Sequence, residues 1–393
     1  MNNVKELLFA KDAKESMLTG IEKLSKAVKA TLGPCGRNVV IESETGGAST
    51  ITKDGVSVAR QVILEDSFEN IGASLVKEVA AKTANAAGDG TTTATVLAES
   101  IYKNGLQALT TGLNATEIKR GIDYAVNAIV DELKEISTDV AGDNDKIINV
   151  ARVSANGDKE IGTVIANAIN TVGIDGTVTV SDSKTAETYF EIIKGMEFSN
   201  GYLSPYFINN EQKGNVELND CLILLYGKKI STINELVPIL NHISQQKRPL
   251  LIITDDIDNE ALTTVVLNKM RGVLSVCIVK SPSFGDIRKE VMQDIAVLTN
   301  GTYLSEEFGV DLENINFSYL GQAKRAIITN NSTTILDGAG DEEALAKRVT
   351  NIQARITNAA NEYEAKVLKR RLSKLTNGVA MIYAGANTVI ELN

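Results

Sequence analysis

Apolar residues recur at helical spacing over much of the first third of the chain. Ile21, Leu24 and Val28 lie three or four residues apart, which predicts an amphipathic helix that stops where Gly33 and Pro34 follow. The same periodicity predicts three further helices, over residues of about 69–87, 92–109 and 116–136. The first 136 residues are therefore expected to be mostly helical.

Two short runs of β-branched residues interrupt this helical pattern. Residues 39–41 and 50–52 predict a pair of strands, with a turn at Gly46-Gly47 between them. The next three residues, Lys53-Asp54-Gly55, are typical of a tight turn of the Asp-Gly kind. They also place a cation and an anion on one turn, so a nucleotide contact is the functional alternative.

The pattern of apolar residues changes near residue 221. Apolar runs at 222–225, 250–253 and 276–279 alternate with segments of helical period, over residues of about 232–246, 257–270 and 286–298. Strands that alternate with helices predict a small, largely parallel sheet with right-handed crossovers. Residues 341–375 predict a helical hairpin, and an extended segment follows Gly378. The fold class is thus multidomain, with a mostly helical part and an α/β part.

Composition narrows the classes of function. At 393 residues the chain is too long for one compact core. Its net charge of -10 and the lack of a basic stripe argue against a nucleic-acid partner, and no apolar run approaches the length of a membrane helix. Cys35, Cys221 and Cys277 are odd in number and widely spaced, which favours buried thiols in a reducing cytoplasm. The single histidine, His242, is expected at a solvated helix position.

The strongest candidate for chemistry is the stretch from Gly88 to Thr95. Two glycines break the chain directly before a run of threonines that opens a helix, where free N–H groups and the helix dipole attract an anion. Asp89 beside such a site would repel phosphate unless Mg²⁺ bridged the two. A simpler interpretation is that Asp89 or a threonine only N-caps the helix. The chain contains neither a GxxxxGK[ST] loop nor a complete GxGxxG fingerprint.

Several motifs, in the same order along the chain, closely resemble those of the group I chaperonins, the GroEL type. They are Thr31-Leu32-Gly33-Pro34, Ile51-Thr52-Lys53-Asp54-Gly55-Val56, Ala87 to Thr95, Ser154-Ala155-Asn156, Gly201 to Phe207, Phe284-Gly285-Asp286 and Leu320 to Arg325. The similarity runs from about residue 5 to the end of the chain.

This resemblance implies three domains. An equatorial ATP-binding domain would cover residues 1–136, an intermediate domain 137–193 and an apical client-binding domain 194–379, with 380–393 returning through the intermediate domain. It also implies homo-oligomeric rings in the cytoplasm, unfolded client proteins, a co-chaperonin lid and the cofactors ATP and Mg²⁺.

The resemblance also implies roles for individual residues. Asp54 would be catalytic by helping to polarise the attacking water, Asp89 would hold magnesium, and Ser154 would lie near the nucleotide. The remaining ATP contacts would be Thr31, Leu32, Gly33, Pro34, Lys53, Gly90, Thr91, Thr92 and Thr93. The residues implied in client binding are Tyr202, Tyr206, Phe207, Val237, Leu240, Leu262, Val266 and Leu267. For any one of these apolar residues, packing of a helix onto the sheet is an equally good explanation.

The chains of this family continue past the point that matches Asn393, into the second half of the equatorial domain. ATP hydrolysis and a stable double ring are therefore not expected of residues 1–393 alone. Two alternatives stay open beside an ATP-dependent chaperonin subunit: an ATP-independent apical holdase, or a chaperonin fragment without function. A metabolic α/β enzyme is a weaker hypothesis, because no constellation of substrate-binding residues is visible.

Overall fold

The computed structural model describes residues 6–33, 35–42, 49–140, 142–155, 157–173, 176–183, 185–210, 213–305, 307, 309, 312–359, 361–388 and 392. The chain divides into two compact units, Met1–Asp139 (unit 1) and Val140–Asn393 (unit 2). None of the helices within the described ranges is both long enough and apolar enough to cross a membrane. The division into equatorial, intermediate and apical domains stays a prediction.

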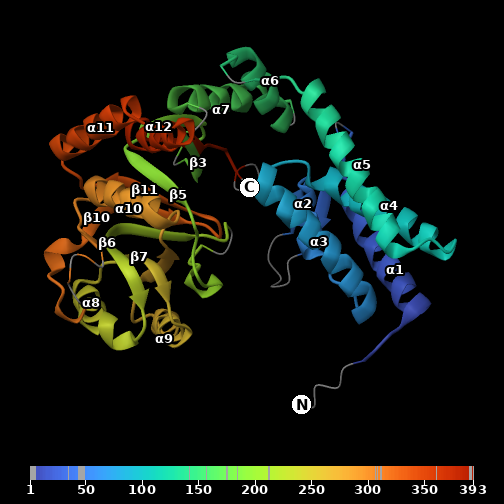
Figure 1. Cartoon of the computed structure of the whole chain (residues 1–393), viewed down its shortest axis with the longest axis horizontal. Helices are drawn as coiled ribbons and strands as arrows, with labels where there is room; N and C mark the ends of the chain where they lie inside the picture. Colours follow the sequence, from blue (N-terminus) through green and yellow to red (C-terminus); the bar gives the residue numbers. More distant parts are fainter. Residues whose placement is uncertain are drawn as a thin grey trace. The chain divides into compact units, whose positions relative to one another are not determined.

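Unit 1 is mostly helical, as the periodicity predicts (Figure 1). Its helices are α1 (Ala10–Lys29), α2 (Gly55–Gln61), α3 (Ser67–Ala87), α4 (Thr91–Thr110) and α5 (Ala115–Ile136). The predicted stripe of α1 is buried, with Ile21, Leu24 and Val28 all in the core of the unit. A Cβ atom on Gly20 would lie 1.8 Å from the carbonyl oxygen of Glu69. Glycine at this position therefore allows α1 and α3 to pack backbone against backbone.

The two predicted strands form an antiparallel pair, β1 (Val39–Ile41) and β2 (Thr50–Thr52). The predicted turn at Gly46-Gly47 lies outside the described residues. The tight turn predicted at Lys53-Asp54-Gly55 is wrong, because Gly55 is the first residue of α2 and Asp54 is its N-cap. An Asp-Gly pair suits a helix start as well as a hairpin, because the aspartate side chain can accept bonds from the first N–H groups of a helix.

Helix α5 carries an apolar stripe that the described part of unit 1 leaves largely exposed. None of its residues is buried, and Ile129 and Leu133 are 59% and 53% exposed. On the neighbouring helices, Leu75, Leu97 and Ile101 are also exposed. Because exposed large apolar side chains in such number are unusual on a monomer, unit 1 has a surface suited to contact with further polypeptide.

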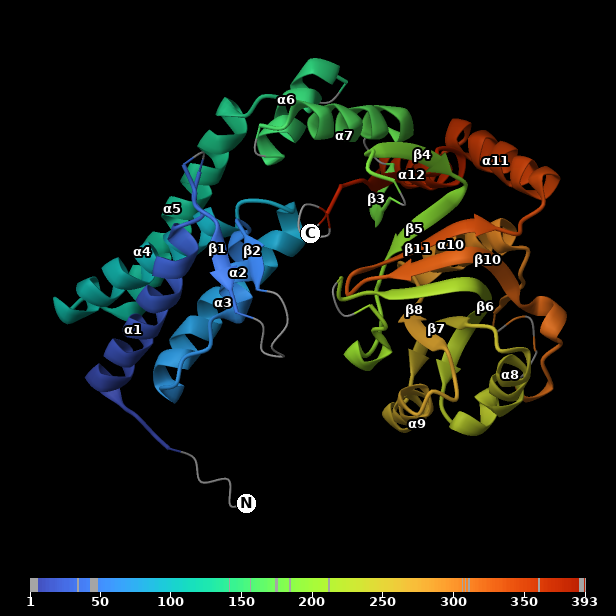
Figure 2. The same cartoon turned by 180° about the vertical axis from the view of Figure 1, so that it is seen from behind.

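Unit 2 is built on a seven-stranded sheet with the order β5-β11-β10-β6-β7-β8, in which β9 also pairs with β6 (Figure 2). Its strands are β5 (Gly195–Ser199), β6 (Val216–Ile230), β7 (Leu250–Ile257), β8 (Val276–Lys280), β9 (Tyr303–Leu304), β10 (Gly321–Ile328) and β11 (Ser332–Gly338). The predicted parallel pairing is confirmed for β6, β7 and β8. The strands β10, β11 and β5, which the apolar runs did not predict, pair antiparallel, and a short polar turn folds β10 directly back into β11.

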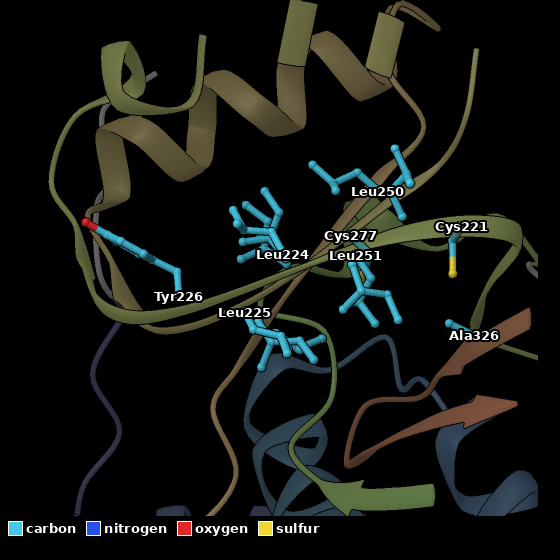
Figure 3. Packing of buried hydrophobic residues seen from close by; sticks show 14 of the residues in the cluster. Cys221, Leu224, Leu225, Tyr226, Leu250, Leu251, Cys277 and Ala326 are labelled. Atoms are coloured by element: carbon cyan, nitrogen blue, oxygen red, sulfur yellow. The ribbon is translucent and has the colours of Figure 1, made fainter. Parts of the chain in front are cut away.

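Three helices connect the parallel strands, close to the predicted ranges: α8 (Ile233–Gln246), α9 (Asn259–Met270) and α10 (Gly285–Thr299). The core lies on both faces of the sheet, and Figure 3 shows Leu224 and Leu225 pointing to opposite sides of β6. Strands buried on both faces read as continuous apolar runs, which explains the rhythm of the sequence.

The cysteine and histidine predictions are confirmed only in part. Cys221 and Cys277 are buried, and burial raises the pKa of the Cys221 thiol to about 12, so neither is a reactive thiol. Cys35 is exposed, contrary to the prediction. His242 is half-buried instead of solvated, since its ring stacks on Phe317 with 3.7 Å between ring centroids.

A second, smaller sheet in unit 2 joins distant parts of the chain. Its strands are β3 (Thr177–Asp182), β4 (Tyr189–Ile193) and β12 (Val379–Ala384), in the order β3-β12-β4. Two helices precede it, α6 (Asn144–Ser154) and α7 (Lys159–Val172), and α7 packs Ala168 and Val172 against β12. The predicted helical hairpin is confirmed as α11 (Glu342–Thr357) and α12 (Glu362–Thr376).

Candidate functional site

Three segments that the sequence analysis singled out meet in unit 1, at the end of α1 and at the starts of α2 and α4. The hydroxyls of Thr31 and Thr92 lie 3.1 Å apart, which joins the first segment to the third. A Cβ atom on Gly55 would lie 2.2 Å from Thr92 Oγ1 and 3.2 Å from Thr91 Oγ1. The start of α2 therefore approaches α4 as closely as only glycine permits.

The start of α4 presents backbone N–H groups without a side-chain cap. Its N-cap is Gly90, in the left-handed region at φ 79°, and no side chain caps the helix. The simpler interpretation, that Asp89 or a threonine caps α4, is therefore wrong. The carboxylate of Asp89 instead accepts a bond from the Gly90 N–H, at 2.6 Å. Since the first N–H groups of a helix have no acceptor within it, they are available to an anion.

Asp54 is held in one orientation by the start of α2. Its Oδ2 atom accepts bonds from Ser57 N and Ser57 Oγ, at 2.9 Å and 2.6 Å, and Oδ1 accepts from Val56 N at 3.4 Å. These bonds explain the residue as a helix cap. They also fix an exposed carboxylate beside the threonines of α4, because Gly55 follows it directly. Its role in polarising water stays a prediction.

The other predicted nucleotide contacts differ in exposure. Thr31 and Thr91 are buried, Lys53 and Thr92 are half-buried, and Gly90 and Thr93 are exposed. Leu32 is 46% exposed, and the space beside Gly33, at φ 70°, is open. Pro34 lies outside the described residues. Ser154 belongs to unit 2, where it is the exposed last residue of α6, and its contact with a nucleotide stays a prediction.

These residues fit a nucleotide phosphate with Mg²⁺ in their donor chemistry. The helix N-terminus, the threonine hydroxyls and the Lys53 ammonium suit phosphate oxygens, and the exposed Asp89 carboxylate suits a magnesium ion that takes its other ligands from phosphate and water. Within the described ranges no group of three acidic, histidine or cysteine side chains is placed to hold a metal alone.

The predicted client-binding residues divide into exposed and buried sets. Tyr206, Val237 and Leu267 are 62%, 41% and 47% exposed, and they lie on three neighbouring elements, the 3-10 turn η1 (Pro205–Phe207), α8 and α9. Tyr202 and Leu262 are half-buried against the core. Three further residues, Phe207, Leu240 and Val266, are buried in the core, so packing explains them and a client cannot reach them in this conformation.

Two exposed apolar residues near the end of α9 were missed by the sequence analysis. Met270 and Val273 are 60% and 55% exposed and flank Gly272, which has φ 71°. A glycine just after a helix indicates that the helix ends there, but it does not show whether the apolar residues near it are exposed. We call the exposed side chains of Tyr206, Val237, Leu267, Met270 and Val273 the η1/α8/α9 surface.

Comparison with known protein families agrees with the order of the motifs. A family model for the TCP-1/cpn60 chaperonin family matches residues 24–373, which is most of the 393-residue chain. The match includes the convergent segments of unit 1 beyond residue 24 and the η1/α8/α9 surface of unit 2. The chain therefore belongs to the TCP-1/cpn60 chaperonin family, a family of protein-folding chaperones.

Proposed function

We propose that the chain is a group I, GroEL-type chaperonin subunit that binds non-native proteins on the η1/α8/α9 surface and uses Mg-ATP to control that binding. The observation that carries the proposal is the convergence of Thr31, Gly55 and Thr92 at the start of α4. These three residues come from three separate motifs of the group I type. Their meeting in one place is what a shared nucleotide site requires.

The chain's own groups have distinct tasks at this site. The N–H groups at the start of α4 and the hydroxyls of Thr91 to Thr93 donate to phosphate oxygens. Lys53 adds positive charge, and the Asp89 carboxylate holds the metal ion. When bound, Mg²⁺ neutralises the charge of the phosphates.

The η1/α8/α9 surface suits clients of many sequences. Hydrophobic burial is non-directional, so exposed Tyr206, Val237 and Leu267 can bind apolar segments without reading a sequence. Folded proteins bury such segments, and the surface therefore selects non-native chains. The proposed partners are unfolded proteins, a co-chaperonin lid, and further subunits that assemble into rings through the uncovered stripe of α5, in the cytoplasm.

The proposal is tested by titrating the full chain with a fluorescently labelled α-lactalbumin whose disulfides have been reduced and alkylated. The double variant Val237→Ser/Leu267→Ser should weaken binding by at least about tenfold, because each truncated contact at a binding site costs about 1 kcal/mol. The matched control Val153→Ser/Val180→Ser removes two side chains of unit 2 that are 79% and 61% exposed but lie outside the surface. It should bind normally.

Mg-ATP should weaken the binding of the unfolded protein by the wild-type chain. Equal binding by the surface variant and the wild type would refute the client surface. If Mg-ATP does not change the affinity of the wild-type chain for α-lactalbumin, nucleotide control is refuted and the ATP-independent holdase is favoured instead.

A further inference from the structure

The turn that carries Tyr206 is closed by backbone bonds from Phe207 N to Ser204 O and from Ile208 N to Pro205 O, and side chains add further bonds to it. Tyr206 N donates to Ser204 Oγ at 3.4 Å, within the turn itself. The carbonyl oxygen of Tyr206 accepts a bond from Lys269 Nζ at 2.7 Å. Both backbone polar groups of Tyr206 are thus satisfied by side chains, while its ring is 62% exposed.

Lys269 makes a second bond to the same turn. Its ammonium also donates to the carbonyl oxygen of Ile208, at 2.9 Å. The two acceptors lie on either side of Phe207, which is fully buried. The Lys269 ammonium, in the last turn of α9, therefore bonds to the carbonyl groups at both ends of the segment 206–208. The central residue of this segment, Phe207, is buried in the core.

We propose that Lys269 is a positioning residue of the η1/α8/α9 surface, which fixes Tyr206 beside α9 as a preformed anchor for apolar client segments. This inference rests on the proposed function. Charge-assisted hydrogen bonds are stronger than neutral ones, so two of them from one ammonium hold the turn firmly. A preformed aromatic anchor loses less conformational entropy on binding than a mobile one, and client affinity rises accordingly.

The length of the Lys269 side chain lets its ammonium reach both carbonyl oxygens from α9. The residue is half-buried, and a long apolar stem with a charged tip packs in this manner. A methionine in its place would retain the stem volume and lose the donors, which defines the test variant Lys269→Met. Arginine retains a cation with donors at a similar reach, so Lys269→Arg is the conservative variant.

The test uses the full chain and two readouts. The first is the rate of chymotryptic cleavage after Tyr206, measured relative to cleavage after Tyr124, which is 79% exposed in unit 1. Lys269→Met should raise this ratio severalfold, and Lys269→Arg should restore it toward the wild type. A wild-type ratio in Lys269→Met, or an equally raised ratio in Lys269→Arg, would show that the Lys269 ammonium does not hold the turn at Tyr206.

The second readout is the affinity for reduced and alkylated α-lactalbumin in a double-mutant cycle with Tyr206→Ala. Lys269→Met should weaken binding about threefold to tenfold in the wild-type background, and much less in the Tyr206→Ala background. Equal losses in the two backgrounds would show that Lys269 acts without Tyr206 and would overturn the proposal. A wild-type chain that does not bind α-lactalbumin would refute the proposed function. The cleavage ratio does not depend on client binding, so it tests separately whether Lys269 holds the turn.

Discussion

Gly55 is the position at which a single methyl group should separate α2 from α4. A Cβ atom there would lie 2.2 Å from Thr92 Oγ1, far inside an ordinary contact distance of about 3.5 Å. Thr92 is the second residue of α4, and its hydroxyl already lies 3.1 Å from that of Thr31. The overlap can therefore be relieved only if the side chain of Thr92 rotates and loses this contact, or if α2 or the start of α4 moves.

The expected cost follows from the overlap. Added methyl groups in packed regions destabilise by about 1–3 kcal/mol, so Gly55→Ala should lower the free energy of unfolding of unit 1 by that amount. The corresponding fall in the midpoint of thermal unfolding is roughly 4–12 °C for a unit of this size. Circular dichroism of the full chain follows the unfolding of helices in both units, so the effect on unit 1 is the difference between the variant and the wild type.

Two further variants make the result specific. Gly105 lies inside α4 with no atom within 4 Å of its added Cβ, so Gly105→Ala should stabilise by roughly 0.5–1 kcal/mol. Thr92→Ala removes the nearest atom in the overlap and should recover more than half of the loss when it is combined with Gly55→Ala. If Gly55→Ala is as stable as the wild type, or if the double variant recovers nothing, α2 and α4 do not meet as described.

The remaining predictions concern unit 2. Burial raises the pKa of Glu197, against the opposing influence of the Thr334 hydroxyl and the Lys374 ammonium, so the folded state favours the neutral acid and loses stability as pH rises through the raised pKa. Glu197→Gln should therefore be more stable than the wild type at neutral pH and lose its advantage below pH 4.5, whereas an advantage that does not vary with pH in urea unfolding would contradict this. Arg371→Met should destabilise by about 3 kcal/mol, because among the described residues it leaves Arg348, at 2.7 Å, as the one cationic partner of the fully buried Asp294. The control Arg355→Met removes a 41% exposed partner of Glu290 and should cost less than about 1 kcal/mol. Equal costs for Arg371→Met and Arg355→Met would show that the burial of an ion pair does not determine its contribution to stability.

The sequence predicted elements better than it predicted exposure. The stripe of Ile21, Leu24 and Val28 implied both a helix and a buried face, and both are observed. On α8, however, Val237 and Leu240 are equally apolar and three residues apart, yet they are 41% and 8% exposed. Periodicity gives the direction of an apolar face, but not its width, which depends on what packs against the helix.

The sequence also failed to predict features that depend on contacts between distant segments. The glycine in Asp54-Gly55 suggested a hairpin. Glycine is needed there because Gly55 packs against Thr92, and Thr92 belongs to α4, a helix that begins only at Thr91. The pairing of β10 with β6 and of β11 with β5 likewise joins segments far apart in the sequence and gives no local signal. The motifs of the candidate site were still visible in the sequence, because a helix start rich in glycine and threonine needs no distant contact to be recognised.

The measurement that tests the central claim most directly is calorimetric titration of the full chain with ATP, with and without Mg²⁺, for the wild type and Asp89→Asn. Asp89 is exposed and its carboxylate contacts the adjacent Gly90 N–H, so the substitution should leave the unfolding midpoint unchanged. We predict that the wild type binds ATP more tightly with Mg²⁺ and that Asp89→Asn loses this dependence on magnesium. Unchanged magnesium-dependent affinity in Asp89→Asn would contradict the assignment of the start of α4 as the nucleotide site.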